Sequence, residues 1–118
     1  GPDWTTINAP FDVAEALADV PSGAVVLLDC ATMWLTNHIL ANHDIVVETQ
    51  KLLTAIDACS AEVVVVSNEV GAGIVPDNAL SRRFREEQGR LNRALAAQSD
   101  LAVLVAAGLP LVLKGTLE

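Results

Sequence analysis

Continuous apolar segments alternate along the chain with longer segments of helical periodicity. The apolar runs Ala24–Leu28, Val63–Val66 and Leu101–Val105 predict three strands. Runs without polar alternation are typical of strands that are covered on both faces of a parallel sheet. A short last strand is expected at Leu111–Leu113. Strands that alternate with helices indicate an α/β fold with a mainly parallel sheet flanked by helices.

The segments between these runs repeat apolar residues at helical spacing and predict four helices, at Phe11–Val20, Ala31–Ala41, Ile45–Ala58 and Ala79–Ala97. Asp12 is expected to cap the first of them. The buried stripes are expected at Val46, Leu53 and Ile56, helped by Leu52, in the third helix and at Leu80, Phe84, Leu91 and Leu95 in the fourth. Trp4–Asn8 predicts a short strand or an extended entry.

Composition narrows the class of protein. The chain has 118 residues, 52% of them hydrophobic, which indicates one ordered domain spanning residues 1–118. A net charge of −8 argues against nucleic-acid and membrane-surface binding but leaves a nucleotide ligand open, because all five arginines fall between Arg82 and Arg93. No apolar run is long enough to span a membrane. We expect a cytoplasmic protein in which Cys30 and Cys59 are reduced.

Polar residues stand where two predicted strands end. Asp29 follows the first buried run, where open parallel sheets bind ligands and where a carboxylate suits a hard cation. The alternative is a helix N-cap for Ala31 onward. Asn68 and Glu69 follow the second run, and Gly71 and Gly73 allow close backbone approach. The alternative for this segment is an ordinary solvent-exposed turn.

The arginine-rich helix has two interpretations. Arginine binds phosphate through its planar fork, which favours a phosphate contact at Arg82 and Arg85. Arginines on an exposed helix also pair with carboxylates one turn away. We expect that second role for Arg90 and Arg93, with Glu86 and Glu87 as partners.

The segment from Val65 to Arg85 reads VVSNEVGAGIVPDNALSRRFR and resembles the adenosylcobinamide kinase / adenosylcobinamide-phosphate guanylyltransferase family of cobalamin biosynthesis. The segment DCATMWLTN, which begins at Asp29, resembles that family too, as does WTTINAP, from Trp4 to Pro10. The resemblance covers nearly all of Trp4 to Gly115. The family has glutamate at the position of Asn8, so the nucleotide contact there is expected to be weaker.

The resemblance implies a P-loop (RecA-like) NTPase fold and two activities. One phosphorylates adenosylcobinamide with ATP or GTP, and the other transfers GMP from GTP to the product, giving adenosylcobinamide-GDP. It implies Mg²⁺ and nucleotide contact at Asp29, a further nucleotide contact at Asn8, and substrate or phosphate contacts at Asn68, Glu69, Gly71, Gly73, Arg82 and Arg85. It also implies homo-oligomers, which are trimers in the family.

The sequence departs from the family at its start. No G-x-x-x-x-G-K-[ST] string occurs, so the N-terminal strand and P-loop are expected to be missing, together with the histidine that carries the nucleotide. The alternative function is therefore a non-catalytic core fragment that only folds or assembles. His38 and His43 do not match the family motif and are interpreted as surface histidines.

Overall fold

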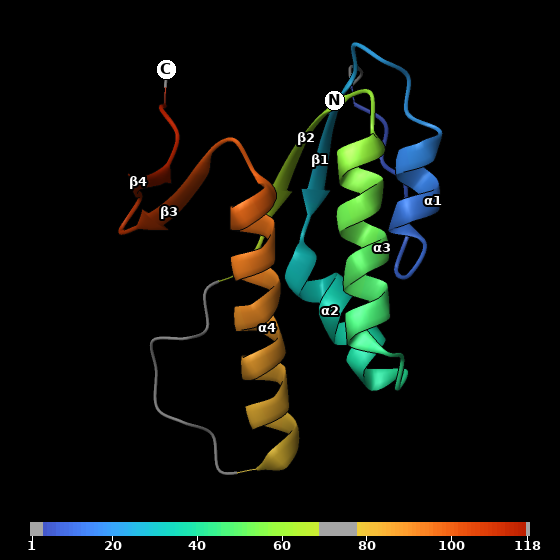
Figure 1. Ribbon diagram of the computed structural model, residues 1–118, viewed down its shortest axis with the longest axis vertical. Coiled ribbons are helices and arrows are strands. Elements are labelled where there is room, and N and C mark those ends of the chain that lie inside the picture. The colour runs from blue at the N-terminus through green and yellow to red at the C-terminus, as the bar shows by residue number, and fades with distance from the viewer. Residues whose placement is uncertain (1–3, 69–77, 118) are drawn as a thin grey trace.

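The computed structural model describes residues 4–68 and 78–117 (Figure 1). Helices and strands alternate through most of this chain, as predicted. The elements are α1 (Val13–Ala18), β1 (Val25–Asp29), α2 (Ala31–Leu40), α3 (Ile45–Ala58), β2 (Glu62–Val66), α4 (Ala79–Gln98), β3 (Ala102–Ala106) and β4 (Leu109–Lys114). The segment Trp4–Asn8, expected to be a short strand or an extended entry, forms no strand.

Strands β1 and β2 form a parallel pair, which confirms the α/β class. Their register places Val25 opposite Glu62 and Asp29 opposite Val66. Helices α2 and α3 make the crossover between them, and α4 returns beside β2 (Figure 1). Both strands therefore end at one edge of the sheet, and α2 begins directly beyond it.

Among the residues that the structure describes, only one face of the parallel pair is covered, and the prediction of strands buried on both faces is wrong. Burial alternates along β1 and β2, with Val26, Leu28, Val63 and Val65 packed against the helices. The intervening residues are exposed, and Val25, Leu27 and Val64 each keep about half of their surface. The sequence of an all-apolar strand does not show whether a second layer covers its other face.

The third predicted strand does not join the parallel pair. Strand β3 pairs with β4 in a separate antiparallel hairpin, with Ala106 opposite Leu109. Its two turn residues, Ala107 and Gly108, both have positive φ, 52° and 75°. Positive φ at both positions matches the twist of a tight two-residue hairpin. The turn therefore favours pairing within the chain over addition to the parallel sheet.

The core lies between the inner face of the sheet and the helices. Its largest fully buried apolar side chains are Leu35, Leu52 and Leu91, each at most 1% exposed. In α3 the buried stripe runs through Ile45 and Leu52, so the expected burial of Val46 is wrong, because that residue is 78% exposed. In α4, Phe84 and Leu95 pack against the core as predicted, whereas Leu80 is exposed.

Two helices begin at side-chain caps. Asp44 accepts a hydrogen bond from the amide of Val47 at the start of α3, and Asn78 accepts one from Ser81 at the start of α4. Such caps satisfy otherwise unpaired amides. Asp12 precedes α1 as expected, but its side chain makes no capping hydrogen bond. Across the residues described, a membrane span would need a longer or more apolar helix than any present.

Candidate functional site

The carboxyl edge of the parallel pair brings together two of the predicted site residues. Asp29 is the last residue of β1 and is exposed, and its register partner is Val66 at the end of β2. Asn68 lies two residues beyond Val66. Ligands of open α/β sheets bind at this edge. Both residues therefore lie at the edge where such sheets bind ligands, and their roles in binding stay predictions.

The capping alternative for Asp29 is wrong. The N-cap of α2 is Cys30, whose side chain makes no capping hydrogen bond. The carboxylate of Asp29 stands before the helix and is exposed. A single exposed carboxylate suits Mg²⁺, which is commonly held by one or two carboxylates together with water and substrate phosphates. Asp29 therefore fits the metal that the family resemblance implies.

The backbone of Asn68 is held on both sides. Its amide donates to Oγ1 of Thr32 on α2 at 2.9 Å. Its carbonyl accepts from Nδ2 of Asn92 on α4 at 2.9 Å. Thr32 is buried and belongs to the first turn of α2. The point where the chain leaves β2 is therefore fixed against two helices at once.

A chain of side-chain hydrogen bonds continues from Asn92. Its Oδ1 accepts from the hydroxyl of Ser67 at 2.6 Å and from Nε2 of Gln88 at 3.0 Å. Nε2 of Gln88 also donates to Ser67 at 2.9 Å. Gln88 is fully buried, and its Oε1 has no hydrogen-bond partner among the described residues. Gln88 and Asn92 were not predicted as functional residues, although their spacing of four residues beside Leu91 places them on the inner side of α4.

The arginines of α4 have separate surroundings. Arg82 is exposed and Arg85 is partly buried, and both belong to the first half of the helix. The helix begins well beyond the carboxyl edge of the sheet (Figure 1). Arg90 pairs with Glu86 and Glu87, as expected from their spacing. A phosphate contact at Arg82 and Arg85 stays a prediction.

Comparison with known proteins adds the decisive observation. The family model described as cobinamide kinase / cobinamide phosphate guanyltransferase matches residues 1–113. The chain belongs to this family.

Curated relatives agree with the family. The chain is 36% identical over 115 residues to the bifunctional adenosylcobalamin biosynthesis protein CobP of Pseudomonas aeruginosa, covering 95% of this chain and 66% of that protein. It is 35% identical over 127 residues to the protein CobU of Escherichia coli, covering 94% and 70%. It is 38% identical over 112 residues to CobU of Salmonella typhimurium, covering 82% and 62%. The chain thus spans about two thirds of the length of these relatives.

The remaining predicted contacts are not tested by the structure. Asn8 is exposed in the extended segment before α1. Glu69, Gly71 and Gly73 lie outside the described residues. Cys30 and Cys59 are free thiols, as predicted. The nucleotide and substrate contacts of these positions stay predictions.

The prediction of two surface histidines is wrong for His38. His38 is only 2% exposed, whereas His43 is exposed. Their Nδ1 atoms lie 2.8 Å apart and share a hydrogen bond. Burial is the main cause that lowers the pKa of His38 below 6.5, and His43 and Lys51 act in the same direction, while Glu48 and the backbone of Phe11 oppose them. This pair lies at the far end of α2 from Asp29.

Proposed function

We propose that this chain is the part of a cobalamin-biosynthesis enzyme that presents the nucleotide and the corrinoid substrate at the carboxyl edge of β1 and β2. The observation that carries the proposal is the placing of Asp29 and Asn68 at adjacent strand ends. Family membership supports the kinase and guanylyltransferase reactions. The carboxyl ends of parallel strands are where sheets of this class bind their ligands.

Two group transfers follow from the proposal. In the first, the hydroxyl oxygen of adenosylcobinamide attacks the γ-phosphorus of ATP or GTP, the nucleoside diphosphate leaves, and the hydroxyl gives up its proton. In the second, a nucleotide-carrying histidine of the kind that the family resemblance implies displaces pyrophosphate from the α-phosphorus of GTP. An oxygen of the new phosphate then attacks that phosphorus, and the histidine leaves to give adenosylcobinamide-GDP. Positioning and charge neutralisation supply most of the catalysis in such reactions.

The proposed roles follow the position of each residue. Asp29 would hold Mg²⁺, which would neutralise the phosphates, and Asn8 would make a weaker nucleotide contact. Asn68 positions the segment that continues to Glu69, Gly71 and Gly73 on the substrate side. Arg82 and Arg85 meet phosphate or a neighbouring copy of the chain, in a homo-oligomer of the kind that the family implies.

Calorimetry with Mg·GTP and Mg·ATP tests the proposal. The measurement is made on this chain and on a longer protein that contains it. Asp29→Asn should weaken nucleotide binding by about 1–3 kcal/mol, the scale of a charged hydrogen-bond partner. Asp57→Asn is the matched control, because Asp57 is an exposed carboxylate on α3. Equal affinity of Asp29→Asn and the unaltered protein would refute the role of Asp29.

The alternative of a non-catalytic core has its own test. We expect this chain alone to form no stable covalent adduct with labelled GTP and Mg²⁺, because neither histidine matches the family motif. Label retained on His38 or His43 after denaturation would contradict that expectation. If a longer protein that contains this chain also bound no nucleotide, the alternative of a non-catalytic core fragment would be favoured.

A further inference from the structure

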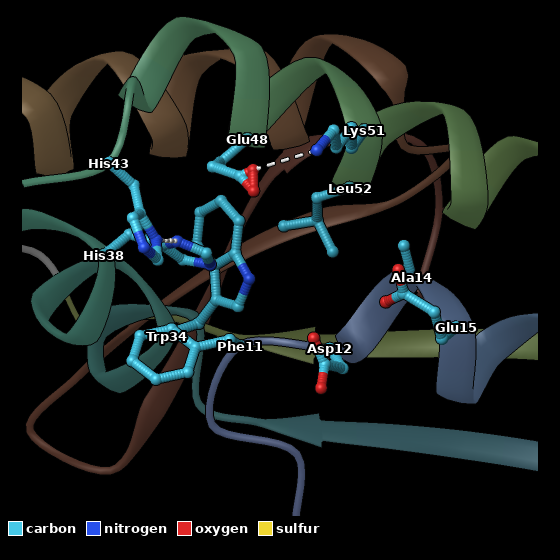
Figure 2. A pocket seen from close by; sticks show the side chains of 10 residues that line it. All are labelled: Phe11, Asp12, Ala14, Glu15, Trp34, His38, His43, Glu48, Lys51 and Leu52. Atoms are coloured by element: carbon cyan, nitrogen blue, oxygen red, sulfur yellow. Dashed lines mark hydrogen bonds and ion pairs between the residues drawn. The ribbon is translucent and has the colours of Figure 1, made fainter. Parts of the chain in front are cut away.

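The junction between α2 and α3 brings two imidazoles and a carboxylate together. His38, His43 and Glu48 each offer a ligand atom, and these atoms all lie within 4.8 Å of one another. Figure 2 shows the three side chains converging from the end of α2, the connecting loop and the first turn of α3. These three residues are not part of the proposed nucleotide site.

Backbone geometry explains why the histidines meet. Asn42 has φ of 59°, its amide donates to the carbonyl of Ile39, and the amide of His43 donates to the carbonyl of His38. This is the Schellman arrangement, which brings the side chain of the second residue after the helix cap against that of the third-last helical residue. Here those residues are His43 and His38, so imidazoles take the place of the usual hydrophobic contact.

Glu48 is placed by the start of the next helix. Asp44 caps α3, so Glu48 lies in its first turn and faces back toward the histidines. A cavity of about 160 Å³ adjoins all three residues and is also lined by Asp12, Glu15 and Lys51. Three carboxylates against one ammonium group favour a cation in this cavity.

Aromatic side chains complete the surroundings. Trp34 contacts the ring of His38 edge to face at 4.7 Å, and Phe11 lies 5.3 Å from His38 and 5.4 Å from His43 between ring centroids. Nε2 of His38 is buried without a hydrogen bond among the described residues. A metal on Nδ1 of His38 would leave this Nε2 as an N–H donor that requires an acceptor such as a carbonyl, and the backbone of Phe11 is the acceptor that already acts on His38.

We propose that His38, His43 and Glu48 form a binding site for a divalent transition metal of the zinc class, which joins the end of α2 to the start of α3. Two imidazoles and one carboxylate with a water molecule make a common four-coordinate zinc set. Magnesium is excluded as the preferred ion because imidazole is a poor ligand for it.

The geometry requires a small adjustment. Metal–nitrogen bonds of about 2.0–2.1 Å at a tetrahedral angle separate two ligand nitrogens by about 3.3 Å. The present separation is 2.8 Å, so the two rings must move apart by roughly 0.5 Å. His43 is exposed and belongs to a loop, so its ring can make that movement. Binding moves the shared proton to Nε2 of one ring, and no proton is lost from neutral imidazoles.

Lys51 opposes the metal. Its ammonium group pairs with Glu48 at 3.5 Å and competes for the carboxylate. Lys51→Met should therefore tighten metal binding several-fold, because it frees Glu48 and removes a positive charge from the cavity. A merely structural histidine pair would gain nothing from this substitution.

Titration calorimetry of metal-stripped protein with ZnCl₂ tests the site, with Co²⁺ absorption as a report of four-coordination. We expect one ion per chain, a rise in Tm with Zn²⁺ and none with Mg²⁺ at equal concentration. His43→Ala and Glu48→Gln should each lower the affinity at least tenfold. Asp57→Asn is the matched control, since Asp57 is an exposed carboxylate of α3 that does not line the cavity.

Two outcomes overturn the proposal. One is the absence of zinc binding at tenfold excess in the unaltered, folded protein. The other is binding that survives in His43→Ala and disappears in Cys30→Ser or Cys59→Ser, which would assign the zinc to thiolates. His43→Ala carries the test because His43 is exposed, whereas replacing the buried His38 could unfold the protein.

Discussion

Asn92 holds the end of β2 in place, and its replacement should weaken the fold markedly. Asn92→Ala removes three hydrogen bonds, with Ser67, Gln88 and the carbonyl of Asn68 as partners. Ser67 and Asn68 are not fully buried and can recover water, but Gln88 cannot. A net hydrogen bond contributes about 1 kcal/mol, and a stranded buried donor costs about 1–3 kcal/mol. Two net hydrogen bonds and one stranded donor together predict a loss of about 3–5 kcal/mol in unfolding free energy.

Gln88→Met is the matched comparison. It removes two hydrogen bonds, worth about 2 kcal/mol together, and also removes a buried oxygen whose lack of a partner costs about 1–3 kcal/mol. Since Oε1 of Gln88 has no partner among the described residues, these effects nearly cancel. The stability of Gln88→Met should therefore lie within about 1 kcal/mol of the parent.

Urea unfolding measured by fluorescence separates the two variants. Trp34 is 5% exposed and reports on the core, whereas Trp4 is 58% exposed and is best replaced by phenylalanine in every sample. The slope of free energy against urea should stay constant. Equal midpoints for Asn92→Ala and the parent would refute the reasoning, as would a larger loss for Gln88→Met than for Asn92→Ala.

Three further predictions concern other parts of the molecule. Gly115→Ala should lower Tm more than Gly108→Ala, because both glycines have positive φ but only a methyl group at Gly115 would overlap the carbonyl of Asp100; equal shifts would contradict this. In chelator, the unfolding free energy should fall as pH drops below 6.5, because burial keeps the folded pKa of His38 lower and the unfolded chain takes up the proton first. The groups that act on the pKa of His38 are His43, Glu48, Lys51 and the Phe11 backbone. In a folded His38→Asn variant, the unfolding free energy should change less with pH below 6.5. Light scattering should show self-association through the exposed apolar faces of the strands, reduced by Leu27→Thr with Val64→Thr; a monodisperse monomer would contradict it.

Much of the local structure could be predicted from sequence. Ile45–Ala58 was predicted with its observed bounds, because Asp44 caps its start and the periodicity continues to its end. Asp29 and Asn68 were predicted at strand ends, because each follows an apolar run. Both predictions depend on patterns of neighbouring residues along one element.

The failures involve partners that lie elsewhere in the chain. The second face of β1 could not be predicted, since an apolar run is the same whether or not a layer covers it. The apolar doublet Ile45-Val46 allowed either residue to face inward, and tertiary packing chose Ile45. The histidine pair required Asn42 to be identified as the left-handed residue that ends α2.

The open face of β1 and β2 has a consequence for selection in the laboratory. Val25, Leu27, Val64 and Val66 contribute little to the core, yet they place apolar surface in water. A library of this chain screened for yield of dissolved protein should accumulate threonine or lysine at these positions first. Their neighbours one step along each strand should stay apolar, so the two faces of the sheet would separate into a tolerant and an intolerant set.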